Sequence, residues 1–397
     1  MLSTKISLLA TKNLNIMLNF EFQNPTKIIF GKGSIAKIAQ QFTHPTKIML
    51  TFGGGSVKRN GVYDQVIDAL KGHEIVEFWG IEPNPKVETL RKAVELGKQE
   101  NVEFIIAVGG GSTVDGTKLI ACAICYDGDA WDLVLDPKKV KGAIPFASVM
   151  TMPATGSEMN NGAVISNLAT KEKYGFYSYY PQFSILDPEV TYSIPPYQVA
   201  CGIADTFVHV MEQYLTATNI NPLMDRWAEG ILLNLIEIAP QIQENPQDYD
   251  LMSQYMLSAT MGLNRFIAMG VPQDWATHNI GHELTALHGV THGESLAIVL
   301  PATMTVLSEQ KHDKILQYGE RVWGITEGTD GIKIAEAIGK TEQFFSQLGL
   351  ATRLSQLNIG EETITEIERR FNERGTLLGE CKNVNGTVAR AILECAL

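Results

Sequence analysis

The chain has 397 residues, of which 44 are acidic and 32 are basic, so its formal net charge at pH 7 is −12. A negative net charge argues against a nucleic-acid-binding protein, which must neutralise phosphates with lysine and arginine. Hydrophobic residues make up 45% of the chain, yet no run of eighteen apolar residues occurs, so the sequence predicts no association with a membrane. The length exceeds what one hydrophobic core usually holds, which favours two domains.

The cysteines indicate a reducing environment. There are five, scattered along the chain without the spacing of a disulfide framework, so we expect a cytoplasmic protein. Cys122 and Cys125 form a C-x-x-C pair inside the apolar run TKLIACAICY. Because no second pair accompanies them, we interpret both as buried helix residues rather than as a redox or zinc site.

Residues 1–16 differ in composition from the rest of the chain. They carry two lysines, no acidic residue and one five-residue apolar stretch, ISLLA. That stretch is shorter than a secretory signal requires, and the absence of arginine argues against a transit peptide. We expect this extension to be disordered or to reflect an upstream start codon, with the first domain beginning at Met17.

Short β-rich runs alternate with helical patterns from Met17 to about Pro195. Strands are expected within 46–52, 73–81 and 101–108, and helices over 56–72, 85–100 and 112–126. Repetition of strand, tight turn and helix predicts a parallel sheet with helices on both faces. The sequence therefore predicts an α/β domain over residues 17–195.

The pattern changes after the proline-marked segment SILDPEVTYSIPP. From Tyr197 onward the chain contains long amphipathic helical stretches and no convincing strand, for example at 197–217, 224–243, 250–266 and 330–349. We therefore predict an all-α second domain over residues 196–397.

Two glycine turns carry a first chemical signal. GGGS occurs at Gly53–Ser56 and again at Gly109–Ser112, each time after an apolar strand and before a helix. Exposed N–H groups and the positive end of a helix favour phosphate binding at such a turn. Neither turn matches G-x-G-x-x-G, and a single glycine triplet serves turn geometry equally well. Two of them in one α/β domain favour a nucleotide cofactor.

The first turn also bears on which dinucleotide binds. Residues 51–61 contain no acid, whereas Ser56, Lys58 and Arg59 offer a hydroxyl group and positive charge. A carboxylate at this position would select NAD by repelling the additional phosphate of NADP. We therefore predict NADP(H). The alternative is that Glu77, about twenty residues after the turn, supplies the NAD-selecting carboxylate.

The histidines carry the second chemical signal. Of the eight in the chain, five lie close together in the sequence, preceded by an aspartate: Asp205, then His209, His278, His282, His288 and His292. On a helix, residues four apart project from one face, which would pair Asp205 with His209 and His278 with His282. For one histidine alone a packing role is the simpler interpretation. Together these residues favour a divalent first-row metal held by three imidazoles and a carboxylate.

Several long motifs give the chain a family resemblance. They are GGGSVKRNG, EPNPKVETLRKA, FIIAVGGGSTVDGTK, MPATGSEMN, SILDPE and GVPQDWATHNIGHELTALHGVTHGESLAIVLP, together with the Asp205–His209 pair. From about residue 18 to 390 the chain resembles the iron-containing (group III) alcohol dehydrogenases, especially the NADP-dependent butanol dehydrogenase and broad aldehyde reductase branch. The resemblance implies a dehydroquinate synthase-like fold, in which a parallel dinucleotide-binding sheet and a helical domain enclose the active site.

The resemblance also implies roles for individual residues. The metal ligands are Asp205, His209, His278 and His292, and His282 lies beside substrate and cofactor as a proton relay or an orienting partner. The implied cofactor contacts are Gly54, Gly55 and Ser56 at the adenosine phosphate, Gly110, Gly111, Ser112 and Asp115 at the pyrophosphate, and Asn84, Thr151, Thr155 and Lys173 elsewhere. His288 receives no role. Intact ligand positions argue against the related maleylacetate reductases, which lack the metal site.

The implied activity is hydride transfer between NADP(H) and small primary alcohols or aldehydes, with Fe²⁺ or Zn²⁺ as the Lewis acid. No basic cluster marks a site for an anionic substrate, and Asn264, Phe266 and Trp275 are candidate pocket residues. Alternatives are a glycerol- or polyol-type dehydrogenase using NAD and a binding protein without turnover. The family leads us to expect a homodimer.

Overall fold

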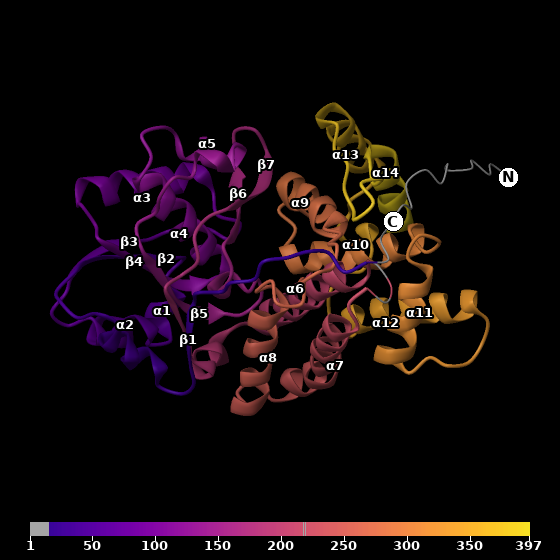
Figure 1. Cartoon of the computed structure of the whole chain (residues 1–397), viewed down its shortest axis with the longest axis horizontal. Helices are drawn as coiled ribbons and strands as arrows, with labels where there is room; N and C mark the ends of the chain where they lie inside the picture. Colours follow the sequence, from indigo (N-terminus) through magenta and orange to yellow (C-terminus); the bar gives the residue numbers. More distant parts are fainter. Residues whose placement is uncertain (1–15, 217, 219) are drawn as a thin grey trace.

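The computed structural model describes residues 16–397 except 217 and 219, so the expected extension over 1–16 lies outside the described residues apart from Ile16. An α/β first half is followed by a helical second half, as the fold class predicted from the sequence requires (Figure 1). Within the described residues, no helix has both the length and the apolar character needed to cross a membrane.

The first half is built on a six-stranded parallel sheet with the strand order β1-β8-β5-β4-β2-β3. Its strands are β1 (Lys27–Phe30), β2 (Lys47–Phe52), β3 (Glu74–Phe78), β4 (Phe104–Gly110), β5 (Phe146–Met152) and β8 (Phe183–Leu186). Along β2, Ile48 and Leu50 enter one core cluster while Met49 enters the other. Both faces of the sheet are therefore covered, which explains why its strands are apolar throughout.

Helices cover the two faces in separate groups (Figure 1). One face packs against η1 (Ser34–Gln41), α1 (Ser56–Arg59) and α2 (Val62–Ala69), and the other against α3 (Val87–Gln99), α4 (Gly111–Ile124) and α5 (Ala130–Leu135). Short 3₁₀ turns lie at η2 (Pro137–Lys139), η3 (Ser157–Met159) and η4 (Pro188–Ser193).

Three local features differ from the expectations. The helix expected over 56–72 is interrupted, because Gly61 adopts a left-handed φ of 76° between α1 and α2. An antiparallel hairpin of β6 (Gly162–Asn167) and β7 (Glu172–Tyr177) was not predicted. Cys122 is buried in α4 as expected, but Cys125 is exposed at the end of that helix, so the interpretation of both as buried was wrong for Cys125.

The second half is helical. Its elements are α6 (Pro196–Tyr214), α7 (Pro222–Glu244), α8 (Tyr249–Gly262), α9 (Ala276–His288), α10 (His292–Val306), α11 (His312–Trp323), α12 (Asp330–Gln347), η5 (Leu354–Leu357), α13 (Glu361–Arg374) and α14 (Gly386–Cys395). Proline at the first position of α6 suits a helix start, since its N–H would be unpaired there. From Val199 to Tyr214 every residue of α6 is buried, so this helix forms the centre of the half.

Candidate active site

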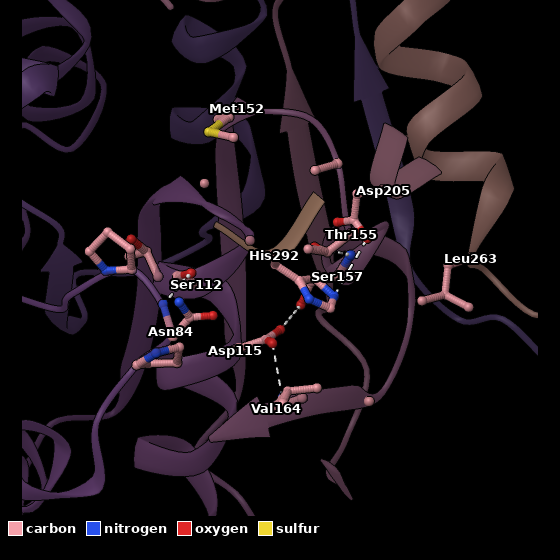
Figure 2. Close-up of a pocket in the computed structure, with 18 of the residues that line it drawn as sticks. Asn84, Ser112, Asp115, Met152, Thr155, Ser157, Val164, Asp205, Leu263 and His292 are labelled. Carbon is pink, nitrogen blue, oxygen red and sulfur yellow. Dashed lines mark hydrogen bonds and ion pairs between the residues drawn. The ribbon is translucent and has the colours of Figure 1, made fainter. Parts of the chain in front are cut away.

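A cleft of about 1000 Å³ lies between the sheet and the helical half. The sheet contributes the segments that follow β2, β4 and β5, and the helical half contributes α6, α9 and the start of α10. Ligands of parallel α/β sheets bind at the carboxyl ends of the strands. Figure 2 shows Asn84 and Ser112 toward one side of this cleft and Asp205 and His292 toward the other.

The glycine turn after β4 packs tightly against its surroundings. A Cβ atom at Gly111 would lie 2.3 Å from Oγ1 of Thr155, and one at Gly109 would lie 2.4 Å from Oγ1 of Thr113. Glycine therefore allows α4 to begin directly at the wall of the cleft, with Gly110 as its N-cap. The amino end of this fourteen-residue helix borders the cleft, an arrangement that favours an anionic group.

Asn84 connects this helix end to the hairpin. Its N–H donates to Oγ of Ser112 at 3.2 Å, and its Oδ1 accepts a hydrogen bond from Nζ of Lys173 at 2.9 Å. Lys173 lies on β7, and burial lowers the pKa of its ammonium group to about 8. Asn84, Ser112 and Lys173 all line the cleft, as does Thr151 at the end of β5.

The turn after β2 is more open. No atom of the described residues lies within 4 Å of a Cβ atom built at Gly54 or Gly55. Both glycines line the cleft together with Ser56, so they face space that a ligand can occupy. Because α1 has only four residues, its dipole attracts an anion less than that of α4.

Glu77, the alternative NAD-selecting carboxylate, is not among the described residues that line the cleft. Its oxygens accept hydrogen bonds from the hydroxyl of Tyr63 at 2.6 Å and from the indole N–H of Trp79 at 2.7 Å. Nζ of Lys58 lies 4.2 Å from the centroid of the Trp79 ring. The carboxylate is thus engaged within the protein, while a cation stands next to the first glycine turn.

Asp115 lines the cleft, but its carboxylate already has partners. Oδ1 accepts a hydrogen bond from Ser157 Oγ at 2.6 Å and Oδ2 from the N–H of Val164 at 2.9 Å (Figure 2). Lys118, which was not predicted, is buried and donates to Ser157 at 2.7 Å and to the carbonyl of Gly162 at 2.6 Å. Burial raises the pKa of Asp115 and lowers that of Lys118 to about 8. This pair fixes α4 to the hairpin.

Three helices bring the four predicted metal ligands together. Oδ1 of Asp205 on α6 lies 3.4 Å from Nδ1 of His209, 3.7 Å from Nε2 of His278 on α9 and 3.6 Å from Nε2 of His292 on α10. Ligand atoms that surround a tetrahedral ion at the usual bond lengths are separated by about 3.4 Å. Asp205, His278 and His292 form a group whose ligand atoms all lie within 4.8 Å of one another. His209 is not part of this group, although its Nδ1 lies 3.4 Å from Oδ1 of Asp205.

The chemistry of these donors fits a divalent cation. Oδ1 of Asp205, Nδ1 of His209 and Nε2 of His278 are buried and have no hydrogen-bond partner among the residues described, although buried polar atoms are normally paired. Against the effect of its burial, the neighbouring histidines lower the pKa of Asp205. Burial lowers the pKa of His209 to about 4. An ionised carboxylate beside a neutral imidazole is the state that metal binding requires.

The two remaining histidines of the cluster differ. His282 lines the cleft one turn after His278, and its ring centroid is 5.2 Å from that of His292. Burial, and then the nearby charge of Lys173, keep the pKa of His282 well below its usual value. His288 lies outside the site, where its Nε2 is 2.8 Å from the hydroxyl of Thr363.

Comparison with known proteins identifies the family of this chain. The sequence profile of the iron-containing alcohol dehydrogenases matches residues 25–188, and that of the C-terminal part of the Fe-containing alcohol dehydrogenase family matches residues 199–394. The chain belongs to this family. The NADPH-dependent aldehyde reductase YqhD of Escherichia coli (strain K12) is 50% identical to it, covering 96% of this chain and 100% of that protein. A probable NADH-dependent butanol dehydrogenase 1 of Bacillus subtilis is 40% identical, covering 96% and 100%.

Solved structures agree in fold. The crystal structure of E. coli K-12 YqhD superposes with a TM-score of 0.95 at 49% identity, covering 96% of this chain and 100% of that chain. NADH-dependent butanol dehydrogenase A of Thermotoga maritima gives a TM-score of 0.92 at 36% identity, covering 96% and 99%.

Glu212 contacts this group of side chains and was not predicted. Its Oε2 pairs with Nδ1 of His278 and accepts the backbone N–H of His278 at 3.1 Å, and its Oε1 accepts the N–H of Thr277 at 2.6 Å. The pairing leaves Nε2 of His278 facing Asp205. Although burial alone would lower it, Glu212 and Asp205 raise the pKa of His278 to about 9. The spacing of Glu212, seven residues after Asp205 on one helix face, was the available signal.

The candidate pocket residues were only partly identified. Trp275 lines the cleft, and its ring centroid is 5.3 Å from that of His278. Asn264 and Phe266 are not among the described lining residues, whereas Arg265 between them is. The helix expected to reach residue 266 ends at Gly262 in α8, and the left-handed φ of 72° at Arg265 belongs to the irregular segment that follows it.

Proposed function

We propose that this protein is a metal-dependent, NADP(H)-linked alcohol dehydrogenase that reduces small aldehydes to primary alcohols. The observation that carries the proposal is the group of buried Asp205, buried His278 and half-buried His292 in the same cleft as the glycine turn Gly109–Gly111. The relative at 50% identity is an aldehyde reductase, which supports the substrate class.

Asp205, His209, His278 and His292 would hold the divalent ion, either Fe²⁺ or Zn²⁺, since both accept imidazole and carboxylate ligands. Bound there, the ion supplies a Lewis acid beside the carbonyl, and NADPH supplies the hydride. Glu212 holds the ring of His278 in one orientation, so that its Nε2 is directed at the other ligands.

The proposed cofactor contacts divide between the two glycine turns and the hairpin. Gly54, Gly55 and Ser56 would contact the adenosine phosphate, Gly110, Gly111, Ser112 and Asp115 the pyrophosphate turn, and Asn84, Thr151, Thr155 and Lys173 the rest of the nucleotide. The engagement of Glu77 with Tyr63 and Trp79, and the position of Lys58, support NADP(H) over NAD(H).

His282 is the proposed proton carrier. Its Nε2 is buried without a hydrogen-bond partner in the described structure, and its depressed pKa keeps the ring neutral near pH 7. A neutral imidazole donates a proton from one nitrogen and accepts one at the other, so it suits the delivery of a proton to an alcohol product. In balance, one aldehyde, one NADPH and one proton give one alcohol and one NADP⁺.

The experiment is a steady-state assay of butanal reduction by enzyme reconstituted with Fe²⁺ or with Zn²⁺, using NADPH and NADH in parallel and glycerol oxidation as the comparison. We expect butanal turnover with NADPH, its loss on chelation, and its loss in Asp205→Ala and His278→Ala with folding and NADPH binding preserved. Full turnover after exhaustive chelation would exclude the proposed metal role.

We further propose a division into a dinucleotide-binding domain at 17–195 and a metal-binding domain at 196–397, supported by the start of α6 at Pro196. A homodimer is proposed from the exposed apolar side chains of Phe22 and Trp227, both in ring contact with Phe266. Sedimentation equilibrium tests this oligomeric state.

A cytoplasmic location is also proposed. It is supported by the five cysteines, all of which are free in the structure.

A further inference from the structure

Arg265 lines the cleft without an anionic partner. Other arginines of the helical half pair with carboxylates, such as Arg226 with Glu229 and Arg370 with Glu283. Among the residues that the structure describes, the guanidinium of Arg265 has no such partner, and its Cζ lies 4.9 Å from the ring centroid of Tyr177 on β7. Contact with an aromatic face does not use the N–H donors of the guanidinium in conventional hydrogen bonds, so these donors remain available to a ligand.

The backbone holds Arg265 in an unfavourable conformation. Its φ of 72° lies in the left-handed region, which glycine adopts freely and arginine does not. The segment is nevertheless fixed, since Nδ2 of Asn160 donates to the carbonyl of Leu263 at 2.9 Å and Oδ1 of Asn264 accepts the N–H of Phe266 at 3.0 Å. A strained residue whose side chain lies in a cleft points to a role for that side chain.

Arg265 follows a segment that is hydrogen-bonded to the helix carrying Asp205 and His209. Nε2 of Gln213 donates both to the carbonyl of His209, at 2.7 Å, and to the carbonyl of Gly262, at 2.8 Å. This side chain therefore connects the helix that carries Asp205 to the segment that carries Arg265. The glycine turns proposed to bind the cofactor lie on the sheet instead.

Charge distinguishes Arg265 further. Lys173 and Arg265 are the cationic side chains among the described residues that line the cleft, and Lys173 is already hydrogen-bonded to Asn84. A guanidinium presents paired N–H donors that match the two oxygens of a carboxylate. The sequence alone favoured neutral substrates because it contains no basic cluster, but one correctly placed arginine is sufficient for a single carboxylate.

We propose that Arg265 binds a carboxylate at the end of the substrate remote from the carbonyl, so that the enzyme prefers ω-carboxy aldehydes, and the corresponding hydroxy acids, over neutral aldehydes of equal length. This inference rests on the proposed function and specifies its substrate class. Tyr177 supports the guanidinium from the opposite side of the cleft.

The test compares succinic semialdehyde with butanal, which have equal numbers of carbon atoms and differ in the terminal group. We expect a higher kcat/KM for succinic semialdehyde, and a loss of that preference by about tenfold or more in Arg265→Gln and Arg265→Gly. Arg265→Gly suits the left-handed φ, so it separates loss of the cation from misfolding. Arg265→Lys retains part of the preference, and the surface variant Arg369→Gln, which removes the same charge from α13, retains all of it.

A binding measurement keeps the inference distinct from the proposed function. The complex of enzyme and NADPH with 4-hydroxybutyrate contains no oxidant, so calorimetry reports its affinity without turnover, and butan-1-ol is the neutral control. We expect Arg265→Gly to weaken the binding of 4-hydroxybutyrate by about tenfold or more and to leave the affinities for NADPH and butan-1-ol unchanged. The role of Arg265 would be overturned if Arg265→Gly weakened the binding of 4-hydroxybutyrate and butan-1-ol equally, or if it weakened only the binding of NADPH. An unchanged preference for succinic semialdehyde over butanal would overturn it as well. Failure of butanal reduction with intact binding would refute the proposed activity alone.

Discussion

Gly293→Ala adds one methyl group at a position where α10 packs against the backbone of α6. The new Cβ would lie 2.1 Å from the carbonyl oxygen of Cys201, whereas ordinary contact begins near 3.4 Å. Because the obstructing atoms are backbone, the two helices must separate by roughly 1 Å. Asp205 lies one turn beyond Cys201 and His292 adjoins Gly293, so this movement alters the 3.6 Å separation of their ligand atoms.

The size of the effect follows from the tolerance of metal sites, in which ligand distances vary by about 0.2 Å. We expect Gly293→Ala to weaken metal binding by about tenfold or more, and overpacking to lower the free energy of unfolding by about 1–3 kcal/mol. Competition with a fluorescent chelator measures the metal affinity, and urea denaturation of the metal-free protein measures the free energy of unfolding.

Gly339→Ala is the matched control. Within the described part of the chain, nothing lies within 4 Å of a Cβ atom at Gly339 in α12, so the substitution should raise the free energy of unfolding by about 0.4–1 kcal/mol and leave metal affinity unchanged. A folded Gly293→Ala protein whose metal affinity stays within about twofold of the wild type would refute the reasoning, because ordinary experimental error is of that size.

Three other predictions concern the same cleft. Glu212→Gln removes the carboxylate that orients His278 and should weaken metal binding by about 10–100-fold in the chelator competition, with NADPH affinity unchanged; equal affinity in both proteins would contradict this role. Burial lowers the pKa of Lys173 to about 8, so its positive charge is present at pH 7 and is lost as the pH rises toward 9. The Kd of NADPH from fluorescence titration should therefore increase over that interval, by roughly tenfold at most, and Lys173→Met should abolish the dependence. Lys58→Glu should lower the ratio of kcat/KM for NADPH to that for NADH by about tenfold, whereas the exposed Lys71→Glu should not change it.

The sequence by itself determined the features that depend only on residues close together in the chain. Strand, glycine turn and helix follow one another within a few residues, so the parallel sheet and its two turns could be read directly. The same holds for Asp205 and His209, because residues four apart on one helix share a face whatever the helix packs against. Family motifs then extended the ligand set to His278 and His292.

Only the tertiary structure decided which distant groups meet. Glu212 reaches His278 across 66 positions of sequence, and Lys118 reaches Gly162 across 44. The hydrogen bonds from Tyr63 and Trp79 to Glu77 likewise could not be predicted from the sequence. Arg265 was missed for a related reason, since it lies in the irregular segment after α8, where the helical periodicity expected up to residue 266 no longer applies. Periodicity reports the faces of regular elements, whereas contacts between elements and irregular turns depend on how the whole chain packs.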